Sequence, residues 1–197
     1  MKSIHKKIYN LAFPYYKKGR DGDVEHLNWL IEVIPQFLKD TNLDSDIMMP
    51  LIILHDTGYS KTAKKNDAFN KDVRIEHTKH SEQISDKILN EINYPKDKIK
   101  KINYLVLHHD DWAFGKNFSD EPLLEFFTNF DFMWMASIEG FEIVRKIARM
   151  KKNEFVFEIE RYEKINQKEG RVWYNKEIQK FYNKLMIERK KELKLQL

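Results

Sequence analysis

The chain has no cysteine, and its 197 residues include only six glycines and five prolines. Without cysteine, a disulfide scaffold, a thiolate metal site and a cysteine nucleophile are all excluded. So little glycine and proline argues against a fold of many short strands and tight turns, whereas lysine, glutamate, leucine and isoleucine favour helices. We therefore expect an all-α fold, and the length fits a single domain.

A strong charge of one sign is also missing, because 35 lysines and arginines are interleaved with 31 aspartates and glutamates, for a net charge of +4. Binding of nucleic acid through the basic C-terminal helix is therefore a weak alternative. The longest apolar run, residues 48–54, is far too short to cross a bilayer, and the N-terminal segment lacks the pattern of a cleaved signal peptide. We expect a soluble, cytoplasmic protein with no membrane partner.

Apolar residues recur at the spacing of three and four that is typical of amphipathic helices. This spacing predicts helices over residues 3–18, from Asp23 to about 38, from 73 to about 92 and from 97 to about 109, then an apolar stretch over 123–150 and a final amphipathic helix through Ile178 and Met186. The run MMPLIIL is apolar on all sides, which predicts a short buried helix with Pro50 in its first turn and His55 at its end. Residues 61–72 lack periodicity and are expected to form a loop over the site.

Histidine is the residue type that points to chemistry. Six of the seven histidines lie at the ends or on the faces of apolar helices, and only His5 falls outside this pattern. Imidazole nitrogens and carboxylate oxygens together suit a divalent ion such as manganese, iron, nickel, cobalt, magnesium or zinc. His55 and Asp56 would supply one neutral nitrogen and one anion, and Gly58 makes a helix end credible there. An ion held in this way keeps enough charge to acidify a bound water, which is useful for hydrolysis.

The motif LIILHDTG, preceded by a lone histidine in VEHLNWL and followed by NFDFMWMASIEG, resembles the HD-domain superfamily of metal-dependent phosphohydrolases. The resemblance spans residues 24 to about 145 and implies a single-domain helical bundle, with 151–197 as a C-terminal helical extension. It implies that one divalent ion, or two, is bound by His26, His55, Asp56 and Asp131. It also implies hydrolysis of a phosphate ester or anhydride, with a nucleotide as the first candidate, by attack of metal-bound hydroxide.

Further histidines lie between the doublet and the last aspartate, where members of the superfamily often use them for a second ion or for the substrate phosphate. His80, His108 and His109 are the candidates here, and His80 fits the family pattern better than His77. Taken alone, His77, like His5, is expected to be structural, but His77 lies one turn before His80 and could line the same face. Asp56 and His80 are the predicted catalytic residues.

Positive side chains in the predicted loop would help to bind the substrate phosphate. Lys61 is the first candidate, with Lys64 and Lys65 beside it. Members of the superfamily that degrade cyclic dinucleotides carry lysine at the position of Tyr59, which argues against that substrate class.

Simpler interpretations remain open for several of these residues. Asp131 would cap a helix or pair with an arginine instead of binding metal. Asp110 and Asp111 would be helix-end or loop residues, or one of them would orient a neighbouring histidine. The whole chain would alternatively be a metal-binding or nucleotide-sensing module without turnover.

Overall fold

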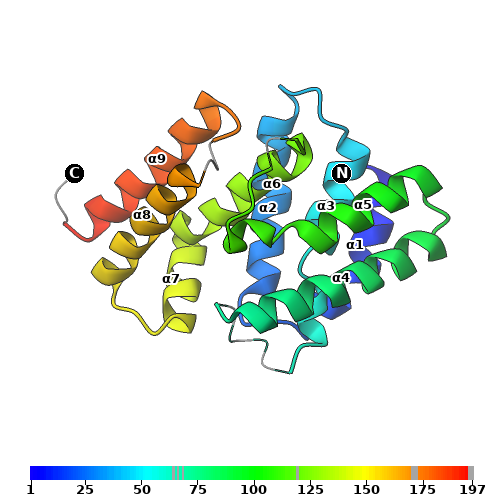
Figure 1. Cartoon of the computed structure of the whole chain (residues 1–197), viewed down its shortest axis with the longest axis horizontal. Helices are drawn as coiled ribbons and strands as arrows, with labels where there is room; N and C mark the ends of the chain where they lie inside the picture. The colour runs from blue at the N-terminus through cyan, green and yellow to red at the C-terminus, as the bar shows by residue number, and fades with distance from the viewer. Residues whose placement is uncertain (64, 66, 68, 119, 170–172, 195–197) are drawn as a thin grey trace. The chain divides into compact units, whose positions relative to one another are not determined.

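Figure 1 shows the computed structural model, which describes residues 1–63, 65, 67, 69–118, 120–169 and 173–194. Within these residues the chain forms nine α-helices and three short 3-10 helices, and no strand. The expected all-α class is thereby confirmed. The chain divides into two compact units, Met1–Asp110 (unit 1) and Asp111–Leu197 (unit 2), and each is described by itself. This division falls inside the family-like core expected over residues 24–145, and the single domain stays a prediction.

Unit 1 contains α1 (Ser3–Tyr16), α2 (Asp23–Leu38), α3 (Ser45–Leu54), η1 (Thr57–Ser60), α4 (Lys71–Glu91) and α5 (Lys96–His108). The short helix α3 lies at its centre, because it packs against α1, α2, α4 and α5. All its residues from 48 to 54 are buried, in agreement with the apolar run in the sequence. The core of unit 1 therefore surrounds the helix that ends at the predicted metal ligands.

Helix α3 begins earlier than the sequence predicts. Asp44 caps it by accepting a hydrogen bond from the backbone N–H of Asp46, so Pro50 lies inside the helix rather than in its first turn. A proline has no N–H to donate to the carbonyl four residues earlier. The hydroxyl of Tyr94 donates to that carbonyl, Asp46 O, over 2.6 Å and replaces the missing bond.

Gly58 sets how closely η1 approaches α4. A Cβ atom at this position would lie 2.0 Å from the His77 carbonyl oxygen and 2.5 Å from the Ser81 nitrogen, so a larger residue does not fit. The N–H of Gly58 donates to Ser81 Oγ over 2.8 Å, and Ser81 is fully buried. This contact holds α4 against the segment that follows His55 and Asp56.

Unit 2 contains η2 (Asp111–Phe114), α6 (Pro122–Met133), η3 (Trp134–Ala136), α7 (Ile138–Ile147), α8 (Lys152–Lys168) and α9 (Lys176–Glu192). The apolar stretch over residues 123–150 is thus divided between α6, η3 and α7. Ser137 starts α7 by accepting a hydrogen bond from the Gly140 N–H. A Cβ atom on Gly140 would lie 2.0 Å from the Trp134 carbonyl oxygen, so the tight approach of α7 to η3 depends on this glycine.

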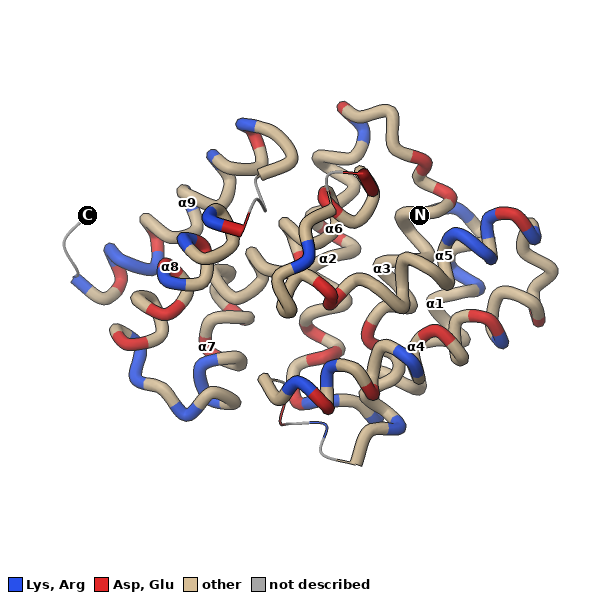
Figure 2. Tube along the Cα trace, viewed as in Figure 1, with Lys and Arg blue, Asp and Glu red and all other residues tan. Residues whose placement is uncertain are grey.

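Charged residues of both signs are interspersed along the helices, as Figure 2 shows for α8 and α9. Arg161 pairs with Glu158 within α8, and Lys190 of α9 pairs with Glu160 of α8 over 2.6 Å. This mixture accords with the small net charge of the sequence. In the part of the chain that the structure describes, no helix has both the length and the apolar composition needed to cross a membrane.

Candidate metal centre

Two histidines stand at equivalent positions at the ends of two helices. His55 is the C-cap residue of α3, and His109 is the C-cap residue of α5. In each ring Nδ1 lies close to the carbonyl oxygen three residues earlier, at 2.9 Å from Ile52 O and 2.7 Å from Val106 O. Because a carbonyl only accepts, Nδ1 donates, and the lone pair of the neutral imidazole is then on Nε2. Both Nε2 atoms face Asp56.

The carboxylate of Asp56 lies between two pairs of histidines. Its Oδ2 is 3.3 Å from His55 Nε2 and 3.5 Å from His26 Nδ1. Its Oδ1 is 3.2 Å from His77 Nε2 and 3.4 Å from His109 Nε2. All five residues are between 0 % and 4 % exposed. Each pair, together with Asp56, places its candidate ligand atoms within 4.8 Å of one another, so each could hold a metal ion.

His77 belongs to this cluster, whereas the histidine preferred from the sequence, His80, does not. The ring of His77 is fully buried and stacks on Tyr59, with the ring centroids 3.9 Å apart. The side chain of His80 is 34 % exposed, and its Nε2 lies 3.7 Å from a Glu76 carboxylate oxygen. The structure thus places His77 rather than His80 in the cluster, and the preference for His80 and its catalytic role stay predictions.

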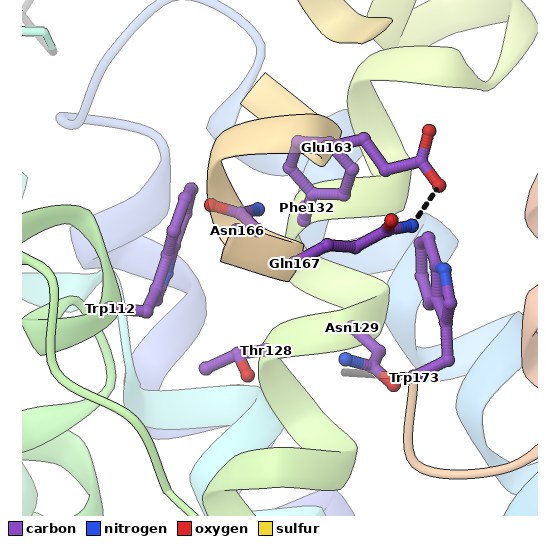
Figure 3. A pocket seen from close by; sticks show the side chains of 8 residues that line it. All are labelled: Trp112, Thr128, Asn129, Phe132, Glu163, Asn166, Gln167 and Trp173. Carbon is purple, nitrogen blue, oxygen red and sulfur yellow. Dashed lines mark hydrogen bonds between the residues drawn. The ribbon is translucent and has the colours of Figure 1, made fainter. Parts of the chain in front are cut away.

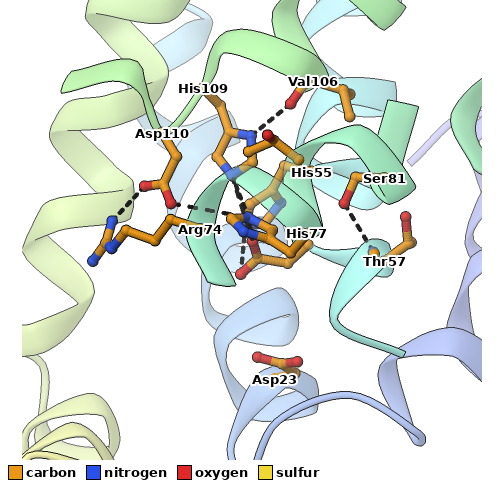
Figure 4. Close-up of polar contacts among 12 residues, drawn as sticks. Asp23, His55, Thr57, Arg74, His77, Ser81, Val106, His109 and Asp110 are labelled. Atoms are coloured by element: carbon orange, nitrogen blue, oxygen red, sulfur yellow. Dashed lines mark hydrogen bonds and ion pairs between the residues drawn. The ribbon is translucent and has the colours of Figure 1, made fainter. Parts of the chain in front are cut away.

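The sequence does contain a signal for His77. At about 100° per residue, position 77 lies between Ile84 and Ile88 on the surface of α4, about 20° from each, so it falls within the apolar stripe of that helix. Position 80 lies beside that stripe. Figure 4 shows the result, with His77 directed toward His109 and His55 from α4.

His108 lies outside both ligand groups. It is half-buried, and its ring centroid is 4.6 Å from that of Tyr104. Of the two adjacent histidines that the sequence leaves open, His109 is the one that enters the cluster. His5 is also buried, but it lies in the first turn of α1 and outside both ligand groups. Its Nε2 is 3.3 Å from a carboxylate oxygen of Asp46.

The predicted phosphate-binding lysines are at the end of η1 and in the segment after it. Lys61 is exposed. The amine of Lys65 donates to the Lys18 carbonyl over 2.8 Å, and Lys64 lies outside the described residues. A role for Lys61 in substrate binding stays a prediction.

Asp131, the fourth ligand implied by the resemblance, lies in unit 2. It is half-buried on α6, between the buried Phe130 and Phe132. Its assignment as a metal ligand stays a prediction, because the ligand groups found within unit 1 do not include it.

Arg20 and Asp23 complete the surroundings of Asp56, and the sequence shows no sign of this beyond a glycine-containing helix break. Arg20 Nη2 lies 2.5 Å from Asp56 Oδ2, and Arg20 Nε lies 2.7 Å from Asp23 Oδ1. The backbone N–H of Arg20 also donates to Asp23 Oδ2 over 2.6 Å. A Cβ atom on Gly19 would lie 2.3 Å from that same oxygen, so glycine leaves room for the Asp23 carboxylate.

The electrostatics of the cluster favour the protonation states that metal binding requires. Burial, the largest influence, raises the pKa of Asp56, but the neighbouring imidazoles and the charge of Arg20 together outweigh it and hold this pKa well below its usual range. Burial lowers the pKa of His77, although the neighbouring Asp56 opposes the shift. The carboxylate is therefore ionised, and the neutral form of the His77 imidazole is favoured.

The second aspartate that follows a histidine, Asp110, has different partners. Figure 4 shows its carboxylate between Arg74 and His77. Arg74 Nη1 lies 2.6 Å from Asp110 Oδ1, whereas His77 Nε2 lies 4.0 Å from Asp110 Oδ2. Asp110 is thus neutralised mainly by an arginine and stands at the edge of the histidine cluster.

Unit 2 has a narrow cavity with aromatic walls, drawn in Figure 3. Trp112, Phe132 and Trp173 line it, with polar side chains from Thr128, Asn129, Glu163, Asn166 and Gln167. Its volume is about 30 Å³, which accommodates a water molecule or two. The aromatic and amide groups would suit a nucleobase, but the space is too small for one. The histidine cluster of unit 1 is therefore the stronger candidate for a catalytic centre.

No family model, curated protein or solved structure matches this chain. The resemblance to the HD-domain superfamily stays a prediction that rests on the residues themselves.

Proposed function

We propose that the chain is a metal-dependent phosphohydrolase of the HD-domain type, which hydrolyses a phosphate ester or anhydride, with a nucleotide as the first candidate substrate. The observation that carries this proposal is the buried carboxylate of Asp56 between two pairs of histidines. A buried carboxylate needs compensating partners, and Arg20 alone would supply a full opposite charge. Four imidazoles around the same carboxylate exceed that need and are typical of a metal site.

The residues present fit one divalent ion, or two. His26 and His55 would hold an ion with Oδ2 of Asp56, and His77 and His109 would hold one with Oδ1. The Nδ1 bonds of His55 and His109 to backbone carbonyls are the supporting contacts that metal-binding histidines usually make. When bound, such an ion acidifies a water molecule and neutralises charge on phosphoryl oxygens.

The surrounding residues hold this ligand set in place and keep bulk water away. Tyr59 is 1 % exposed and covers His77, and Gly58 allows α4 to approach closely enough for His77 to reach Asp56. Rigid, desolvated ligands favour catalysis because they need little rearrangement during the reaction. Lys61 would add positive charge from the exposed end of η1.

The test is to purify the protein, reconstitute it separately with manganese, nickel, cobalt and iron, and measure phosphate release from a broad panel of phosphorylated metabolites. We expect at least one substrate to be hydrolysed, and Asp56→Ala to abolish the activity. Asp46→Ala is the control, because it breaks a His–Asp contact of the same length, 3.3 Å, between the buried His5 of α1 and the partly exposed Asp46.

The metal content of the same preparations separates this proposal from a module that binds metal without turnover. Stoichiometric metal that depends on Asp56, with no hydrolysis of any substrate, would favour such a module. Absence of both metal binding and hydrolysis would contradict the proposed function.

A further inference from the structure

Arg20 is a charged group in direct contact with the ligand set, and one of its nitrogens has no acceptor among the described residues. Nε donates to Asp23 and Nη2 to Asp56, over 2.7 and 2.5 Å. Nη1, by contrast, donates to none of the described residues. The side chain is 15 % exposed, and Nη1 is not among the fully buried polar atoms that lack a partner. Arg20 thus combines a fixed position with free donor capacity.

The guanidinium is held in one orientation by its contacts with Asp56, Tyr59 and Asp23. Its carbon lies 3.6 Å from the ring centroid of Tyr59, which supports the flat group by a cation–π contact. Asp23, itself 2 % exposed, binds both the side chain and the backbone of Arg20. A guanidinium fixed in this way loses little further conformational entropy when it binds an anion.

Holding a metal ion does not explain this arginine. Its positive charge contacts Asp56 Oδ2, the oxygen that also faces His26 and His55, and so opposes a divalent ion placed there. A neutral donor would support the carboxylate without that repulsion. The charge is explained if the completed site also receives an anion, because a guanidinium beside an ion stabilises phosphoryl oxygens.

We propose that Arg20 binds the phosphoryl group of the substrate through Nη1 and positions it at the metal centre. This inference rests on the proposed function and names the residue that recognises the anionic part of the substrate. Arg74 is the natural comparison, because it is also an arginine paired with a buried aspartate at the edge of the cluster, but its partner is Asp110 rather than Asp56.

The test uses the whole protein loaded with Mn²⁺ and titrated calorimetrically with inorganic phosphate. Because Arg20→Gln alone leaves the Asp23 carboxylate buried without its partner, the variant is the pair Arg20→Gln with Asp23→Asn. The control is the matching pair Arg74→Gln with Asp110→Asn, because Asp110 is also buried. We expect the Arg20 and Asp23 pair to weaken phosphate binding by about tenfold or more, since a hydrogen bond between charged groups is lost. The Mn²⁺ affinity of the pair should be nearly unchanged, because the pair removes one positive and one negative charge and keeps all five residues of the cluster.

If Arg20 were merely structural, its replacement would not lower the phosphate affinity while the Mn²⁺ affinity is retained. Equal losses of Mn²⁺ and phosphate affinity, together with a lower melting temperature, would overturn the proposal. Phosphate binding that is as tight in the Arg20 and Asp23 pair as in the unaltered protein, or equally weakened in the control pair, would also overturn it. These titrations need no turnover, so failure of the proposed function would be seen separately, in the metabolite assay.

Discussion

In the two His-Asp doublets of this chain, residues 55–56 and 109–110, the histidines make the same backbone contact, whereas the aspartates have different partners. Both histidines cap a helix and donate from Nδ1 to the carbonyl three residues earlier. Each doublet is followed at once by a 3-10 helix. Asp56, however, contacts four imidazoles and one arginine, whereas Asp110 pairs with Arg74 and approaches a single imidazole at 4.0 Å.

The difference shows that the backbone places the histidine, while neighbouring elements decide what the aspartate does. Two residues after Asp56 stands Gly58, which admits the backbone of α4 and brings His77 to the carboxylate. Two residues after Asp110 stands Trp112, a large buried side chain. The same dipeptide therefore gives a candidate bridging ligand in one place and an arginine partner in the other.

The largest expected contrast comes from neutralising each aspartate in turn. Asp56→Asn removes the anion shared by both ligand groups and should weaken Mn²⁺ binding by more than about 100-fold, which is beyond the usual effect of changing a supporting residue. Asp110→Asn keeps all five residues of the cluster. Calorimetric Mn²⁺ titration of both variants measures the contrast, and similar losses in the two would show that the doublets are equivalent.

The next largest effect is expected from Gly58→Ala. The added Cβ would collide with the backbone of α4 at His77, and we expect a loss of about 1–3 kcal/mol in the free energy of unfolding, as for other overpacked sites. Mn²⁺ binding should weaken as His77 moves away. Urea unfolding and Mn²⁺ titration measure the two effects.

Gly140→Ala in unit 2 is the matched control, because its Cβ would also come within 2.0 Å of a backbone carbonyl oxygen. It should destabilise the protein to a similar degree and leave the Mn²⁺ affinity unchanged at temperatures where the protein is folded. A loss of Mn²⁺ affinity in both variants would indicate general unfolding rather than a displaced ligand.

A smaller contrast should separate the two histidines of α4. His77→Ala removes a candidate ligand nitrogen 3.2 Å from Asp56, and we expect Mn²⁺ affinity to fall by about 10- to 100-fold. His80→Ala changes a partly exposed side chain and should alter it by less than about twofold. The opposite ranking, measured by the same titration, would restore the sequence-based preference for His80.

The smallest expected effect is that of Asp110→Asn itself. The carboxylate is 4.0 Å from His77 and already paired with Arg74, so Mn²⁺ affinity should fall by less than about tenfold. A larger loss, seen in the same titration, would mean that Asp110 ligates an ion directly.

Much of the fold follows from the sequence because apolar periodicity is a local property. The helices that begin near Ser3, Asp23, Lys71 and Lys96 lie close to where their spacing predicts them. The start of α3 does not, because the interior Pro50 is tolerated only through the hydroxyl of Tyr94, a residue distant in the sequence. The bond from Tyr94 cannot be predicted from the residues next to Pro50, so the sequence places the proline in the first turn.

The site, like the fold, can be predicted in part from the sequence. His26, His55 and Asp56 are visible as a motif and do meet in space. Arg20 and Asp23 are not visible, because their partnership depends on a loop conformation and on the space left by Gly19. The apolar stripe of α4 indicates His77, whereas the pattern of the superfamily favours His80.

The hydrogen bonds from His55 and His109 to Ile52 and Val106 end on main-chain oxygens. The side chains at positions 52 and 106 take no part in aiming the imidazoles, and they only need to fill the core. Random mutation should therefore exchange them for other aliphatic residues while the direction of both Nε2 atoms is retained. In a library of variants selected for metal binding, positions 52 and 106 should drift freely in shape but never to proline or a charged residue.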